Sequence, residues 1–180
     1  MENKDSKALA VVRWICDRAI KGVPPLSSAG NLALEYKIDR GYPDDDSRGG
    51  ALINWETSKN FTSGFISGLG GILTLPVAVP AALGASWVIQ ARMAGAIAVI
   101  YGHEITEDRV RTLVLLSLVG DSAKEIIKQA GIRLGRQLSK ELIMKIPGKI
   151  LIEINKKIGF RLLTKAGEKG IVNIVRVVPV

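Results

Sequence analysis

The chain has 180 residues, of which 47% are apolar, 5% are aromatic and 23% are charged. The apolar share is too high for a disordered chain, and the length suits a single domain. With one cysteine and one histidine, the chain has neither a disulfide framework nor a His/Cys zinc cluster.

Long stretches rich in Ala, Leu, Ile and Gly, without runs of alternating Val, Thr and aromatic residues, predict an all-α fold. We expect a helical bundle of six or seven helices around a central apolar helix over residues 77–101. One domain is expected overall. Residues 1–48 should form an N-terminal helical segment with an acidic loop, and residues 49–180 the main helical part.

At the N-terminus, apolar residues at helical spacing predict a first helix that starts after Asp5 or Ser6 and stops before the Pro24-Pro25 pair. A short second helix is predicted from Ser27 or Ser28 to about residue 39.

The stretch 41–50 is rich in turn-forming residues and contains three adjacent aspartates, Asp44, Asp45 and Asp46. They lack the alternate spacing and the terminal glutamate of an EF-hand calcium loop. We therefore expect a solvated loop.

Residues 60–91 contain no charged side chain, and Arg92 is the only charged residue before Glu104. The predicted helix over residues 77–101 is long enough to span a bilayer. Two interpretations remain open. The region is either the centre of a soluble helical bundle or a membrane-inserted or re-entrant hairpin.

Arg92 is the unusual residue of this stretch. Buried arginines persist when they are paired and hydrogen-bonded. We expect Arg92 to pack against a carboxylate, with Asp121 as the first candidate and Glu107 or Asp108 next. The alternative is an arginine that reaches water from an interfacial helix.

Three or four further helices are predicted after this stretch, and three of them can be placed. Thr106 is the expected N-cap of the first, which runs to residue 120, and Asp121 or Ser122 begins the second, which ends at Pro147. An amphipathic third helix is expected over residues 150–163, before two glycines at 167 and 170.

Charge is concentrated in the last third of the chain. Residues 1–121 hold 12 basic and 13 acidic side chains, whereas residues 122–180 hold 13 basic and 4 acidic ones. Phe160 is the only aromatic residue among them, which disfavours single-stranded nucleic acid and favours lipid headgroups. We expect no nucleic-acid partner, and either a solvated face or contact with an anionic membrane or a membrane protein through Arg133, Arg136, Lys140, Lys156, Lys157 and Arg161.

Catalytic motifs are not evident. A Ser-His-acid site would have to use His103, whose neighbours look like a turn between helices, and Cys16 lies on an apolar helical face. No Walker A sequence, nucleophile elbow or paired-carboxylate metal motif occurs. We expect no enzyme activity, no catalytic or metal site and no cofactor.

The sequence from Gly64 to Ala81, GFISGLGGILTLPVAVPA, closely resembles the signature of the EcsC protein family. Later segments resemble the family in the same order, including IQARM at 89–93, LVGD at 118–121 and GFRLLTK at 159–165. The resemblance covers residues 50–180, so the main helical part is EcsC-like. Family members continue beyond the final Val-Pro, so we expect this chain to lack the family's usual C-terminal end.

The family takes its name from a protein encoded beside an ABC transporter linked to secretion, and the resemblance implies no particular biochemical activity. It carries over no catalytic residue. The glycines and prolines of the family pattern are expected to shape the backbone, and they are Gly68, Gly70, Gly71, Pro76 and Pro80.

The sequence as a whole predicts a membrane-associated accessory or interaction protein. It would work on the cytoplasmic side, peripheral or re-entrant at the inner face of the cell membrane. Alternatives are a membrane-permeabilising, pore-forming module and a soluble binding module. A second copy of the chain is a further candidate partner.

Overall fold

The structure is a computed structural model that describes the backbone of residues 2–60, 81–132 and 145–177. Within these ranges it contains seven helices and no named strand, which confirms the all-α prediction. The helices are α1 (Glu2–Lys21), α2 (Ala29–Ile38), α3 (Asp45–Asn60), α5 (Ala81–Ile100), α6 (Asp108–Ser117), α7 (Ser122–Gln129) and α9 (Gly148–Val177).

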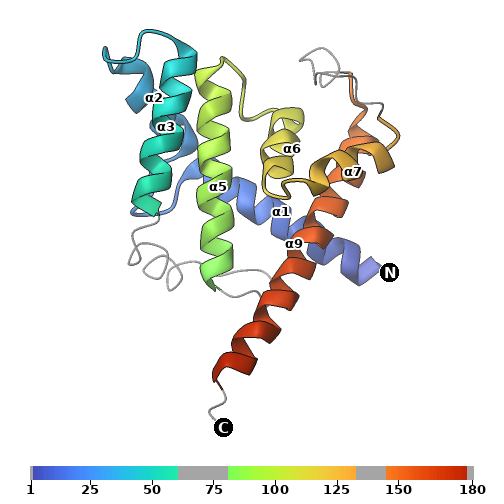
Figure 1. The fold of residues 1–180 in the computed structure, drawn as a ribbon. Helices are drawn as coiled ribbons and strands as arrows, with labels where there is room; N and C mark the ends of the chain where they lie inside the picture. Colours follow the sequence, from blue (N-terminus) through green and yellow to red (C-terminus); the bar gives the residue numbers. More distant parts are fainter. Residues whose placement is uncertain (1, 61–80, 133–144, 178–180) are drawn as a thin grey trace.

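The apolar helix α5 stands at the centre of the arrangement (Figure 1). It contacts α2 and α3 on one side and α1 and α6 on the other, while α9 contacts α1, α6 and α7. The largest group of buried apolar residues joins α1, α5, α6, α7 and α9, and a second group joins α2, α3 and α5. Because α5 contributes to both groups, it ties the two halves of the fold together.

Most of the predicted apolar stripe of α1 is buried: Ala8, Val11, Val12, Ile15 and Cys16. The last predicted member, Ile20, is only half-buried, and Ala19 is buried beside it. The predicted start of this helix is wrong, because α1 begins at Glu2. Asp5 does not cap the helix but forms an ion pair with Lys156 of α9, with 2.9 Å between Oδ2 and Nζ. The helix ends at Lys21 and is followed by Gly22, whose φ of +81° is a conformation that other residues rarely adopt.

Ser28 is the N-cap of α2, as predicted, and its Oγ accepts a hydrogen bond of 3.0 Å from the backbone N–H of Asn31. The prediction of an acidic loop over 41–50 is partly wrong, because α3 starts at Asp45. The Asp44 carboxylate accepts a 2.7 Å hydrogen bond from the N–H of Ser47, and the next two aspartates lie in the first turn, where the helix dipole favours them. The predicted division between residues 48 and 49 falls inside α3.

Helices α6 and α7 are shorter than predicted. Glu107, and not Thr106, occupies the N-cap position of α6, which ends at Ser117. Helix α7 starts at Ser122 as expected but stops at Gln129, because Gly131 adopts a φ of +78° that ends the helix.

Helix α9 is longer than predicted. It has 30 residues and continues past the glycines at 167 and 170 to Val177. Its buried residues follow helical spacing along one face, and they are Leu151, Ile154, Ile158, Leu162 and Ala166. This face packs against α1 and α6.

Candidate functional site

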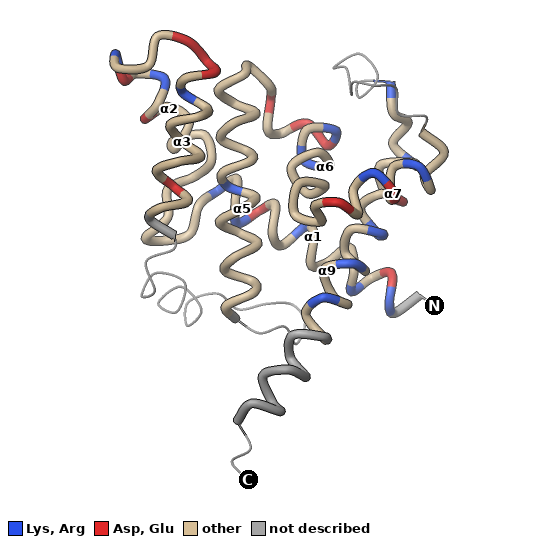
Figure 2. Tube along the Cα trace, viewed as in Figure 1, with Lys and Arg blue, Asp and Glu red and all other residues tan. Residues whose placement is uncertain are grey.

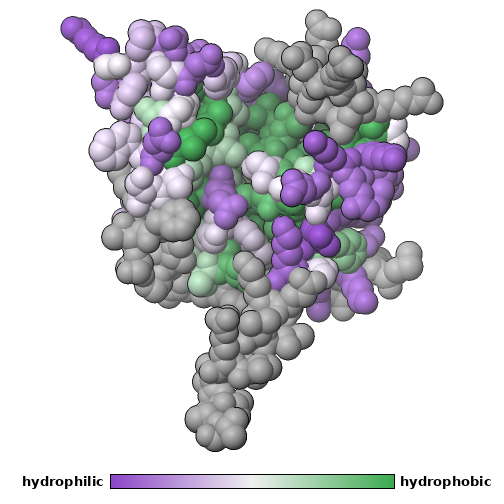
Figure 3. Space-filling model, in the orientation of Figure 1, coloured by the Kyte–Doolittle hydropathy of each residue, from purple (hydrophilic) through white to green (hydrophobic). Residues whose placement is uncertain are grey.

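Basic residues gather along α7 and the neighbouring turns of α9 (Figure 2). Among residues 122–132 and 145–167, whose side chains the structure describes, eight are basic and two, Glu125 and Glu153, are acidic. We call the exposed or half-buried side chains Lys124, Lys128, Lys157 and Arg161 the α7–α9 basic surface. The space-filling view shows hydrophilic residues over these helices, beside an apolar area nearer the middle of the molecule (Figure 3).

The predicted lipid or partner contacts are placed only in part. Lys156 is held by Asp5 of α1, whereas Lys157 and Arg161 lie on the α7 side of α9. The Lys157 Nζ donates to Oε1 of Gln129 at 3.0 Å, and the Arg161 Nε donates to Oγ of Ser122 at 3.1 Å. The other three predicted contacts lie outside the described residues; they are Arg133, Arg136 and Lys140. The same holds for the backbone-shaping residues Gly68, Gly70, Gly71, Pro76 and Pro80.

Arg92 is buried in the middle of α5, as predicted, with 5% of its surface exposed. Its Nη1 lies 3.2 Å from Oε2 of Glu56 on α3. Its Nε donates to the carbonyl oxygen of Ser27 at 2.6 Å, and its Nη2 donates to the Ser27 hydroxyl at 2.8 Å. This arrangement joins α5, α3 and the turn before α2.

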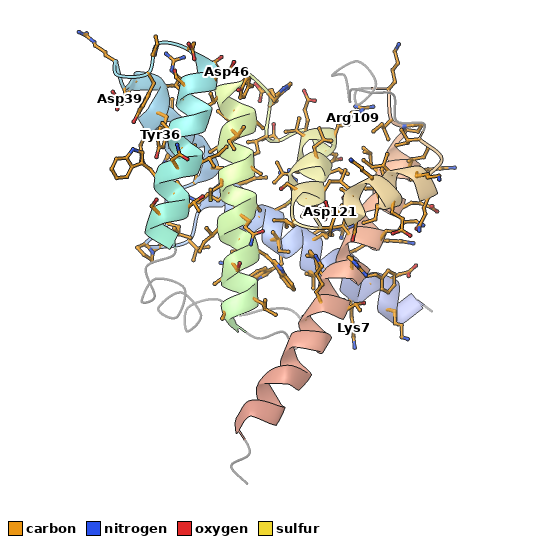
Figure 4. The ribbon with its side chains drawn as sticks, in the orientation of Figure 1. Lys7, Tyr36, Asp39, Asp46, Arg109 and Asp121 are labelled. Atoms are coloured by element: carbon orange, nitrogen blue, oxygen red, sulfur yellow. The ribbon has the colours of Figure 1, made fainter. Side chains whose placement is uncertain are left out.

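The predicted partners of Arg92 are wrong. Asp121 is exposed at the turn between α6 and α7, on the far side of α6 from α5 (Figure 4). Glu107 and Asp108 lie at the start of α6. The interfacial alternative for Arg92 is also contradicted, because the guanidinium is enclosed by protein and bonded to three acceptor atoms.

Glu56 was missed because its burial depends on the contact between α3 and α5. One pattern in the sequence could have indicated it. Gly49, Leu52 and Glu56 follow helical spacing, and all three are buried. An acidic residue on the same face as a buried leucine predicts a buried partner of opposite charge.

A cavity of about 500 Å³ lies between α1, α6 and α9. Each helix lines it with residues one turn apart. Its apolar wall includes Val12 and Cys16 of α1, Leu115 of α6 and Leu151 of α9. Its polar residues are Arg13, Asp17, Asp108, Arg111 and Asn155.

Cys16 is the only cysteine of the chain and contributes to the wall of this cavity. Burial raises the pKa of its thiol from 9.0 to about 12, and nearby Arg111 only partly opposes the effect. A thiol that stays protonated at neutral pH is a poor nucleophile. The part of the chain that the structure describes also contains no group of three metal-binding side chains.

One helix in the described ranges, Ala82–Ile100, is long and apolar enough to cross a membrane. Just over half of it is buried inside the protein. The core helix of a soluble protein has the same length and composition, and α5 packs against four other helices here. In this conformation α5 is therefore a core helix.

Comparison of the chain with protein-family models, curated proteins and solved structures finds no match.

Proposed function

We propose that this protein is a membrane-associated accessory protein that docks peripherally on an anionic membrane surface, without catalysing a reaction. The observation that supports the proposal is the excess of basic side chains on α7 and α9, eight against two acidic ones among the described residues. Anionic lipids attract a basic side chain near the surface by about 1 kcal/mol. The resemblance to the EcsC family is consistent with such an accessory role.

The fold favours peripheral docking over insertion of the apolar region. The Arg92–Glu56 ion pair and the Ser27 hydrogen bonds hold the middle of α5 against its neighbours. Insertion of α5 into lipid would separate these groups and leave charges in an apolar medium, at a cost of several kcal/mol. The α7–α9 basic surface can meet headgroups without any such change.

The proposal is tested by co-sedimentation of the full chain with vesicles. We expect binding to vesicles that contain phosphatidylglycerol and little binding to pure phosphatidylcholine. Binding should weaken as salt approaches 1 M, where the screening length falls to about 3 Å. The double variant Lys157→Gln/Arg161→Gln should bind about 10- to 30-fold more weakly, because it removes two charges.

The matched control is Lys21→Gln/Arg40→Gln, which removes two exposed charges from the α1 end and the α2–α3 loop. This variant should bind like the unchanged protein. Equal binding to both vesicle types, or equal loss in the two variants, would contradict docking through the α7–α9 basic surface. An absence of binding to either vesicle would favour the soluble binding module.

The length and apolar character of Ala82–Ile100 favour an alternative function, in which the protein permeabilises membranes. The two functions differ in vesicle leakage. A docking protein binds phosphatidylglycerol vesicles without releasing a trapped dye, whereas a pore-forming module releases it.

A further inference from the structure

The cavity between α1, α6 and α9 has the volume of a small-molecule site, which is typically 300–1,000 Å³. Val12, Cys16, Leu115 and Leu151 are buried and form its apolar wall. Apolar cavities of this kind hold apolar groups better than water. The wall therefore suits a hydrocarbon chain.

Charged side chains of both signs surround the same cavity. Arg13 and Asp17 come from α1, and Asp108 and Arg111 come from α6. Within the described ranges, none of these four residues takes part in an ion pair. Arg13, Asp17 and Asp108 are exposed, and Arg111 is half-buried, with its Nε donating to the carbonyl oxygen of Ile105 at 3.4 Å. Accessible charges of both signs beside an apolar wall favour a ligand head that also carries both signs.

Asn155 gives an independent indication of a bound polar group. It lines the cavity, and its Oδ1 atom is buried without a hydrogen-bond partner. Buried acceptors without partners are rare in folded proteins, and a ligand that donates a hydrogen bond would satisfy this one. An ammonium or hydroxyl group can donate, whereas a carboxylate cannot.

We propose that this cavity binds a single-chain amphiphile with a zwitterionic, hydrogen-bond-donating head, such as a lysophosphatidylethanolamine. The acyl chain lies against the apolar wall. The phosphate pairs with the arginines, and the ammonium pairs with the aspartates. This site is separate from the α7–α9 basic surface, since it lies on the α1 side of α9, and its occupancy does not depend on membrane docking.

The experiment uses the full chain and three amphiphiles with the same 14-carbon chain, each below its critical micelle concentration. They are myristoyl lysophosphatidylethanolamine, myristate and tetradecyltrimethylammonium. Binding is measured by calorimetry and by protection of Cys16, the only thiol, from dithiodipyridine at pH 9. We expect saturable, one-to-one binding of the zwitterion that slows thiol modification at least tenfold. The two singly charged amphiphiles should bind at least tenfold more weakly.

Phosphoethanolamine without a chain is expected to give no protection, because the apolar contact is then missing. Arg111→Gln and Asp17→Asn should each weaken binding of the zwitterion about tenfold or more, as expected for loss of a charge-assisted contact. Arg40→Gln, which changes an exposed arginine far from the cavity, should leave the affinity unchanged. Circular dichroism of each variant checks that it is folded.

Three results would overturn the proposal. They are an absence of saturable binding, equal binding of all three amphiphiles, and retention of zwitterion affinity in folded Arg111→Gln and Asp17→Asn proteins. Vesicle binding distinguishes this site from the docking surface. The Lys157→Gln/Arg161→Gln protein should lose vesicle affinity and keep the affinity for the lysolipid.

Discussion

Gly159 of α9 and Ala8 of α1 meet so closely that a Cβ atom on Gly159 would lie 2.3 Å from the carbonyl oxygen of Ala8. Ala8 itself is fully buried. No side chain larger than hydrogen fits at Gly159 unless the two backbones move apart. The contact between α1 and α9 therefore depends on this glycine, much as small residues let helices approach elsewhere.

Gly159→Ala should lower the free energy of unfolding by about 2–4 kcal/mol, because the added methyl group overlaps the α1 backbone. Urea unfolding followed by circular dichroism measures the change. The control is Gly167→Ala on the same helix, where a Cβ atom meets nothing within 4 Å. That change should be neutral or stabilise by up to about 1 kcal/mol. Equal effects of the two substitutions would contradict the close packing.

Removal of one partner from the Arg92–Glu56 pair should be costly. Glu56→Gln leaves the guanidinium of Arg92 buried without its carboxylate, and we expect a loss of about 3 kcal/mol in the free energy of unfolding. The double variant Arg92→Met/Glu56→Met should recover most of this loss, because no uncompensated charge remains. Both values come from urea unfolding.

The control for the buried pair is the partly exposed i,i+3 pair of Arg48 and Asp45, with 2.8 Å between Nη1 and Oδ1. Asp45→Asn should change stability by less than about 1 kcal/mol. A Glu56→Gln effect as small as this one would show that the Arg92 pair has no special role in joining α3 to α5.

Local features of this fold can be predicted from the sequence, whereas contacts between distant segments cannot. The apolar stripe of α1 and the Ser28 cap were predictable because each depends on residues within a turn or two of helix. The burial of Arg92 followed from its position in an uncharged stretch. The identity of its partner could not be predicted in this way, because Glu56 is 36 residues away and meets Arg92 only when α3 packs on α5.

The same limit applies to the start of α3 and to the cavity. Three consecutive aspartates resemble a loop, but Asp44 caps a helix and the other two lie in its first turn. Three segments together form the wall of the cavity: the α1 residues around Cys16, the α6 residues around Arg111 and the start of α9. No spacing within one segment of the sequence indicates that these three helices meet.

The buried thiol of Cys16 makes stability depend on alkaline pH. Its pKa is raised in the folded protein from 9.0 to about 12. The unfolded chain therefore loses this proton first, so the stabilisation is complete below pH 9 and is lost as the pH rises from 9 towards 12. Between these limits the free energy of unfolding should fall by up to about 1.4 kcal/mol per pH unit through this group.

Cys16→Ala isolates the thiol from the tyrosines, which also titrate at high pH. Its free energy of unfolding should decline less steeply than that of the unchanged protein between pH 9 and 11. Urea denaturation at half-unit steps of pH measures both slopes. Parallel slopes would show that the thiol is not the group responsible.

Tryptophan fluorescence can report where α5 lies when the protein is bound to a membrane. Trp87 is a buried residue of α5, with 6% of its surface exposed, whereas Trp55 of α3 is 57% exposed. A variant that keeps only Trp87, made by Trp14→Phe and Trp55→Phe, reports on α5 alone.

In peripheral docking α5 stays inside the protein, so phosphatidylglycerol vesicles with brominated acyl chains should leave the Trp87 fluorescence nearly unchanged. Insertion would bring the indole among the brominated chains and quench it, and the same vesicles would then release a trapped dye. Quenching together with dye release would replace the docking proposal by the membrane-permeabilising one. Vesicle binding without quenching and without dye release would support peripheral docking. In that case α5 remains a core helix, held by the ion pair of Arg92 and Glu56, and the α7–α9 basic surface contacts the lipid.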